Sequence, residues 1–208
     1  MSEYQEIFDS MKCRIPAGKI GEAEVAKFRV TKEGAAWANL SMMMNGTGER
    51  QVNTGHYTRL VVGKTLMMSD TRAERNEHIE AVRNAKGSVL ITGLGLGMVA
   101  QACLKRPEVT DVTVIEKSAD VIALVKPHLP KRGLTVIHAD AFEWKPMNGE
   151  KWGMVWHDIW PDICSDNLVE MGKLCRKFAR RAEWQSCWNY DWTKRLKRQE
   201  RDSYGYGW

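Results

Sequence analysis

Short apolar runs alternate with amphipathic stretches from residue 88 onwards. The runs predict strands at 88–92, 111–116, 134–140, 152–158 and 182–188, and the stretches between them predict helices at 98–106, 118–129 and 166–180. Apolar strands that alternate with helices are typical of a parallel sheet covered by helices on both faces. The pattern therefore predicts an α/β fold with a doubly wound, mainly parallel sheet.

The first part of the chain lacks this alternation. It predicts extended segments at 23–30 and 57–69, the latter with a turn at Gly63, a Gly-, Met- and Asn-rich loop at 41–55, and a polar helix at 71–85 that begins at Asp70 or Thr71. We therefore expect a small β-rich extension with a lead-in helix over 1–86, ahead of a main domain over 87–190.

The net charge of +5 is unevenly distributed. Residues 173–201 hold ten Lys/Arg and three Asp/Glu, so this segment alone is more basic than the whole chain. Such a run is either a solvated basic face or a contact for nucleic acid or another polyanion. Because the rest of the chain is slightly acidic, a general nucleic-acid binder is not favoured.

The spacing of the cysteines and the length of the apolar runs indicate whether the chain forms disulfides, binds metal or crosses a membrane. The five cysteines are odd in number and include no CxxC pair, which predicts neither a disulfide framework nor a zinc site. The first ten residues are polar, and no run of 18 apolar residues occurs. We expect a cytoplasmic protein with reduced thiols, no membrane segment and no bound metal.

A glycine-rich turn lies between the first main-domain strand and its helix. Gly93, Gly95 and Gly97 form a GxGxG pattern, which is either a tight strand-to-helix turn or a place where the backbone approaches a ligand closely. Glu116 ends the next strand, 19 residues beyond Gly97, where an acid can accept hydrogen bonds from ribose hydroxyls. Together these features predict a ligand that contains adenosine.

Two further acidic positions end the next two strands. Asp140, followed by Ala141, ends the third strand and Asp158 ends the fourth, so we expect them to converge with Glu116 at one edge of the sheet. An acid after the third strand suits the adenine amino group and favours an S-adenosylmethionine (SAM) enzyme over a dehydrogenase. Met98 stands where a GxGxxG dinucleotide pattern would need its last glycine, which points the same way.

These residues resemble the SAM-dependent methyltransferase superfamily, most closely its spermidine synthase (polyamine aminopropyltransferase) branch. The resemblance rests on SVLITGLGLGMV, TDVTVIEKSADVIALVKPHLP, LTVIHADAFEW and WGMVWHDIWPD, preceded by YTRLVVGKTLMMSDTRAERNEHIEAV. It implies a Rossmann-like fold that binds SAM or decarboxylated SAM. By this resemblance the three glycines hold the methionine portion, Glu116 the ribose, Asp140 and Ala141 the adenine, and Asp158 faces the sulfonium.

The acceptor half of the spermidine synthase pattern is altered. Leu96 replaces an Asp within the glycine turn, Pro161 replaces a second Asp with Asp162 one step late, and Glu77 replaces a Tyr. The resemblance therefore favours methyl transfer to a small molecule or an exposed macromolecular group, as in hybrid methyltransferase-like proteins of phages and bacteria. Aminopropyl transfer and noncatalytic binding of SAM or a nucleoside are the alternatives.

Three residues are candidates for moving a proton during transfer. Asp158 leads, with the alternative that it caps a helix or only holds the donor, and His157 and Asp162 follow. One residue before Asp158 on a strand, His157 should point to the opposite face. Trp160 either lines the site or packs in the core, and Trp156 presents the same alternatives.

The chain is short for the full methyltransferase sheet, which has two strands after the fifth. About 20 residues follow Trp188, and they predict a basic helix at 192–202 within a tail over 191–208 whose last residues, 203–208, are disordered or docked. We therefore expect a sheet that is truncated after the fifth strand. Its exposed edge would be covered by the Trp-rich tail or by a second subunit in a homodimer.

Overall fold

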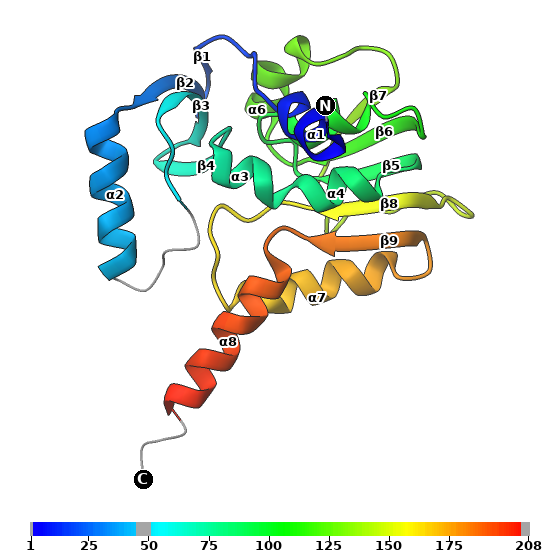
Figure 1. The fold of residues 1–208 in the computed structure, drawn as a ribbon. Helices are drawn as coiled ribbons and strands as arrows, with labels where there is room; N and C mark the ends of the chain where they lie inside the picture. The colour runs from blue at the N-terminus through cyan, green and yellow to red at the C-terminus, as the bar shows by residue number, and fades with distance from the viewer. Residues whose placement is uncertain (1, 45–50, 205–208) are drawn as a thin grey trace.

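A five-stranded parallel sheet forms the centre of the molecule (Figure 1). A computed structural model describes residues 2–44 and 51–204 of the chain. The strand order is β7-β6-β5-β8-β9, with bounds β5 Gly87–Thr92, β6 Val109–Glu116, β7 Leu134–His138, β8 Trp152–His157 and β9 Ala182–Cys187. The predicted α/β class with a Rossmann-like parallel sheet is confirmed. Within the described residues, the sheet ends at β9, as the predicted truncation requires.

Helices cover both faces of this sheet. On one face lie α4 (Ile79–Asn84), α5 (Met98–Cys103) and α6 (Ala119–Val125), and on the other lies α7 (Asn167–Phe178). The alternation of side chains along β5 explains the two cores, because Val89 and Ile91 pack on the first face while Leu90 packs on the α7 face. The strand order reverses between β5 and β8, and such a reversal opens a crevice at the carboxyl ends of the strands.

The N-terminal extension is a second, antiparallel sheet. Its order is β1-β2-β3-β4, with bounds β1 Gly18–Ile20, β2 Ala23–Val30, β3 Gly55–Val62 and β4 Thr65–Ser69. The predicted turn is confirmed: Gly63 joins β3 to β4 with a φ of 60°. Three elements were not predicted: β1, the helix α2 (Lys32–Met44) and the helix α1 (Glu3–Ser10). Ser2 caps the first turn of α1 by accepting from the Gln5 amide.

The predicted loop at 41–55 is wrong at its beginning. Helix α2 runs over Lys32–Met44, and residues 51–54 precede β3 without regular structure, while 45–50 lie outside the described residues. Thr31 accepts a hydrogen bond from the Gly34 amide at 3.1 Å and so caps the helix. The Ala, Leu and Met residues of this segment favour helix, and the turn-forming residues begin only at Asn45, after the end of α2.

The lead-in helix is interrupted in its middle. It consists of α3 (Arg72–Glu77) and α4, separated at His78, whose amide donates to the Arg75 carbonyl three residues back rather than four. Thr71 is the N-cap residue, as one of the two predicted alternatives had it. The predicted helix at 118–129 likewise ends early, and α6 is followed by a 3₁₀ turn, η1 (Lys126–His128), that contains Pro127.

Helix α8 (Tyr190–Tyr204) starts two residues before the predicted basic helix. It packs against α7 and projects away from the sheet (Figure 1), so it does not run along the edge strand β9. Cover of that edge by the tail is therefore not found in the described residues, and cover by a second subunit stays a prediction. Of the predicted tail, 205–208 lie outside the described residues. No described helix has the length and apolar character needed to cross a membrane.

Candidate ligand site at the sheet edge

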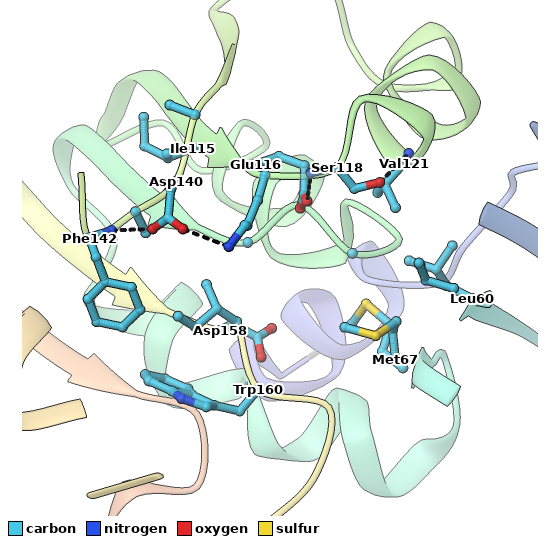
Figure 2. Close-up of a pocket in the computed structure, with 18 of the residues that line it drawn as sticks. Leu60, Met67, Ile115, Glu116, Ser118, Val121, Asp140, Phe142, Asp158 and Trp160 are labelled. Carbon is cyan, nitrogen blue, oxygen red and sulfur yellow. Dashed lines mark hydrogen bonds and ion pairs between the residues drawn. The ribbon is translucent and has the colours of Figure 1, made fainter. Parts of the chain in front are cut away.

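A cavity of about 490 Å³ lies between the carboxyl ends of the central strands and the β3–β4 hairpin (Figure 2). Its walls come from β3, β4 and β6, from the loops that follow β5, β6, β7 and β8, and from one residue each of α6 and α7. The lining residues are Leu60, Val62, Met67, Met68, Gly93, Gly95, Ile115, Glu116, Lys117, Ser118, Val121, Ala139, Asp140, Ala141, Phe142, Asp158, Ile159, Trp160 and Glu170. Glu116, Asp140, Ala141 and Asp158, which are far apart in sequence, meet there.

Glu116 is held by backbone donors on both carboxylate oxygens. Its Oε2 accepts from the Leu94 amide at 2.8 Å and its Oε1 accepts from the Ser118 amide at 2.7 Å. The first bond ties the end of β6 to the glycine turn after β5. Its side chain is therefore fixed in the wall of the cavity, where the remaining lone pairs can accept hydroxyl protons.

Only part of the glycine turn reaches the cavity. Gly93 and Gly95 line it with φ values of 97° and 50°, and a Cβ on Gly93 would collide with the Asp158 carbonyl oxygen. Gly97 does not line the cavity. It is the N-cap residue of α5 with φ 68°, and a Cβ there would lie 2.6 Å from the Leu129 side chain, so it permits close packing instead.

Asp140 forms a fixed acidic corner beside Ala141. One carboxylate oxygen accepts from the Phe142 amide at 2.8 Å and the other pairs with Lys117 Nζ at 2.8 Å. The hydrogen bond from Lys117, with that from Phe142, lowers the pKa of Asp140 below its usual value. Because the Lys117 side chain is 80% exposed, it can leave Asp140 when a ligand donates to that carboxylate.

Among the acids that line the cavity, Asp158 has the pKa that departs most from its usual value. Burial, together with the charges of Glu74, Glu77 and Glu116, raises the pKa of Asp158 to about 8. Its Oδ2 lies 3.8 Å from His78 Nε2, and the side chain is 18% exposed. A carboxyl group that is protonated at neutral pH and sits on a cavity wall is a common property of groups that transfer protons.

The other two proton-transfer candidates lie away from the cavity. His157 is fully buried on the α7 face, where its Nδ1 lies 3.0 Å from Thr92 Oγ1 and its ring is 5.5 Å from Phe178. Burial lowers the pKa of His157 to about 4. Asp162 is exposed in the loop before α7, where its carbonyl accepts from the Asn167 side chain. His157 points to the face opposite that of Asp158 because side chains alternate along a strand, as its position one residue before Asp158 predicts.

The tryptophans divide between the cavity and the core. Trp160 lines the cavity with 5% exposure, and its Nε1 donates to Glu170 Oε2 at 2.9 Å. Trp156 is outside the lining and stacks on Trp184 with ring centroids 6.2 Å apart. Trp160 therefore both lines the cavity and packs in the core on the α7 face, whereas Trp156 packs in the core on the opposite face.

Sequence reasoning missed the wall that the N-terminal sheet supplies. Leu60, Val62, Met67 and Met68 line the cavity from β3 and β4. Met68 Sδ accepts the Leu96 amide at 2.9 Å and packs on Gly95, so it covers the middle of the glycine turn. The strand pattern locates these residues on a hairpin, but no signal in it says that the hairpin faces the glycine turn.

The lining residues fit an adenosyl ligand. The volume is within the range of small-molecule sites, the walls are mainly apolar, and carboxylates for ribose and adenine donors lie on neighbouring strands. Glu116 and Asp140 would hold the nucleoside, and Gly93 and Gly95 line the cavity beside them. Among residues 2–44 and 51–204, no three His, Cys, Asp or Glu side chains are grouped as metal ligands.

Comparisons with known proteins give likenesses in fold. No protein-family model and no curated protein matches the sequence. A SAM-dependent methyltransferase from Mesorhizobium loti is 14% identical over 51% of this chain and 49% of that protein, with a TM-score of 0.39. A spermidine synthase from Thermotoga maritima is 15% identical over 78% of this chain and 51% of that protein, with a TM-score of 0.41.

A third solved structure is a complex with SAH. The plantazolicin methyltransferase BpumL, in complex with SAH, is 13% identical over 52% of this chain and 39% of that protein, with a TM-score of 0.37. The chain thus spans about half or less of the length of these proteins.

Proposed function

We propose that this chain is a SAM-dependent methyltransferase whose acceptor carries a basic nitrogen. The observation that supports it is the gathering, in one cavity, of two acids suited to adenosine and a third acid held largely protonated. Glu116 and Asp140 would bind the ribose and the adenine. Asp158 would face the reacting groups. The donor supplies a methyl group activated by its positive sulfur.

The charges around Asp158 favour a cationic acceptor. Glu74, Glu77 and Glu116 all disfavour a negative charge on Asp158, so an ammonium group nearby would relieve that repulsion and lower the Asp158 pKa. The Asp158 carboxylate can then accept the proton that the amine must lose before it attacks the methyl carbon. Positioning of the acceptor in line with the donor completes the contribution of the protein.

Aminopropyl transfer is the second candidate, and one observation favours it. Lys117 is the only cation among the described cavity residues, and it is paired with Asp140. Within the glycine turn, the Leu94 and Leu96 amides already donate to Glu116 and Met68. A donor without a carboxylate, such as decarboxylated SAM, would need no cation there. Against it, Asp162 lies outside the cavity, so a second acceptor carboxylate is lacking at that position.

Calorimetry on the whole chain tests the donor. We expect SAM and SAH to bind more tightly than decarboxylated SAM and methylthioadenosine. Glu116→Gln should weaken SAM binding by roughly tenfold to a hundredfold, because charge-assisted hydrogen bonds to ribose are lost. The matched control is Asp111→Asn, an acid on the same strand that accepts from Ser88 Oγ and does not line the cavity. Failure of all four ligands to bind would contradict the proposal.

The nucleoside product separates the two transfer reactions. The protein is incubated with SAM and a panel of primary and secondary amines, and in parallel with decarboxylated SAM and the same panel. Methyl transfer releases SAH from the first mixture, and aminopropyl transfer releases methylthioadenosine from the second. If a donor binds but neither product forms with any amine, the chain is a noncatalytic binding protein, and the proposal that the acceptor carries a basic nitrogen is refuted.

A further inference from the structure

Two thiols touch each other at the end of the central sheet, away from the ligand cavity. Cys175 on α7 and Cys187, the last residue of β9, have their sulfur atoms 3.6 Å apart. Neither lines the cavity. Among the described residues this is the only contact between two thiols, and it plays no part in the proposed transfer reaction.

The backbone on both sides of this contact is tightly held. Gln185 Nε2 donates to the Cys175 carbonyl at 2.9 Å, which ties β9 to α7 beside the thiols. Cys187 is 2% exposed, while Cys175 is half-buried and so accessible from solvent. A disulfide has a sulfur–sulfur distance of about 2.0 Å, so closure requires the two sulfur atoms, now 3.6 Å apart, to approach by about 1.6 Å.

The charges near the pair favour one thiolate. A hydrogen bond from Cys187, aided by the positive charges of Lys194 on α8 and Arg176 on α7, lowers the pKa of Cys175 to about 7. The same contact, burial and the charge of Asp158 raise the pKa of Cys187, and the positive charge of Lys194 opposes this increase. Cys175 is therefore the thiolate that attacks, and Cys187 is the thiol that resolves.

We propose that Cys175 and Cys187 form an oxidisable dithiol, a modification site that hydrogen peroxide converts to an intramolecular disulfide and that thiols reduce again. In the first step the Cys175 sulfur attacks one peroxide oxygen, the O–O bond breaks, and water leaves after protonation. Cys175 is then a sulfenic acid. In the second step the Cys187 sulfur bonds to the Cys175 sulfur, the S–O bond breaks, and the Cys187 proton leaves with the hydroxyl as a second water.

The other cysteines lack this combination of contact and access. Cys13 and Cys103 are buried, and burial raises the pKa of both, that of Cys103 to about 12. Cys164, in the loop before α7, is half-buried like Cys175 but is not in contact with another thiol. It is therefore the matched control for exposure without a partner.

Peptide mass spectrometry tests the proposal on the whole chain. The folded protein is treated with hydrogen peroxide, its remaining thiols are alkylated, and it is digested with trypsin without reductant. Cleavage at Lys and Arg leaves Cys175 in residues 174–176 and Cys187 in residues 182–194. We expect these two peptides to appear joined, lighter than their sum by two hydrogen atoms, and to separate after dithiothreitol.

Variants and pH distinguish the pair from general oxidation. The joined peptide should form equally in the wild type and in Cys164→Ser, and its rate should rise between pH 6 and 8. Cys187→Ser should stop at a Cys175 sulfenic acid, which dimedone traps and which needs no disulfide to be seen. Oxidation of Cys164 ahead of Cys175, or conversion of wild-type Cys175 to a sulfinic acid without the joined peptide, would overturn the proposal.

Discussion

Asp158 and His157 are adjacent in sequence, but strand alternation places their side chains on opposite faces of the sheet. Burial disfavours the charged form of each, so it raises the pKa of Asp158 to about 8 and lowers that of His157 to about 4. Both side chains are therefore mainly neutral at pH 7. Asp158 lines the cavity and meets other acids, whereas His157 packs among Thr92 and Phe178 in the core. Their different surroundings suit Asp158 to proton transfer and His157 to packing.

The raised pKa of Asp158 predicts how stability depends on pH. Between about pH 4 and 8 the folded protein keeps a proton that the unfolded chain releases, so the free energy of unfolding falls as pH rises, by at most about 1.4 kcal/mol per pH unit. Asp158→Asn removes this loss. Urea denaturation should show the variant gaining on the wild type from pH 4 to 8.5. A difference that is constant with pH would contradict this, and exposed Asp162→Asn is the control.

At the scale of elements, the glycine turn joins three parts of the site. Glu116 of β6 accepts from it, Met68 of β4 packs on it, and the backbone after β8 crosses it at Gly93. The GxGxG pattern therefore serves packing as much as ligand access. Gly97 illustrates the packing role, because its missing Cβ makes room for Leu129.

Gly93→Ala should destabilise the fold more than an ordinary left-handed glycine would. Its φ of 97° disfavours a side chain, and the new Cβ would collide with the Asp158 carbonyl, so we expect a loss of about 3 kcal/mol. Gly149→Ala is the matched control, since its φ is 81° but no atom lies within 4 Å of the new Cβ. That variant should lose only about 1 kcal/mol in urea denaturation. Equal losses would refute the close approach at Gly93.

At the scale of the molecule, buried polar contacts link the N-terminal sheet to the segment that follows α1. Asp70 is fully buried between β4 and α3, where it accepts from the amides of Thr58 on β3 and Cys13 after α1 and pairs with Lys12 Nζ at 2.8 Å. Helix α2 does not share in this packing. It presents four large apolar side chains to solvent, Trp37, Leu40, Met43 and Met44.

Asp70→Ala should therefore loosen the extension that supplies one cavity wall. The substitution leaves two buried amides without their acceptor, and we expect a loss of about 3 kcal/mol of stability and a lower melting temperature. Asp191→Ala, on exposed α8, is the control and should change stability by less than about 0.5 kcal/mol. Thermal unfolding followed by circular dichroism measures both. A loss no larger than the control's would contradict the role of Asp70.

The alternation of apolar strands and helices was enough to predict the central sheet, the succession of strands and helices along the chain, and the acids at the carboxyl ends of three strands. Those features depend on local periodicity, and the carboxyl ends of parallel strands necessarily share one edge. The cavity's second wall, the pKa of Asp158 and the contact between Cys175 and Cys187 were decided by tertiary structure. Each requires segments far apart in the chain to meet at distances of a few ångströms, and desolvation and sulfur–sulfur contact arise only then.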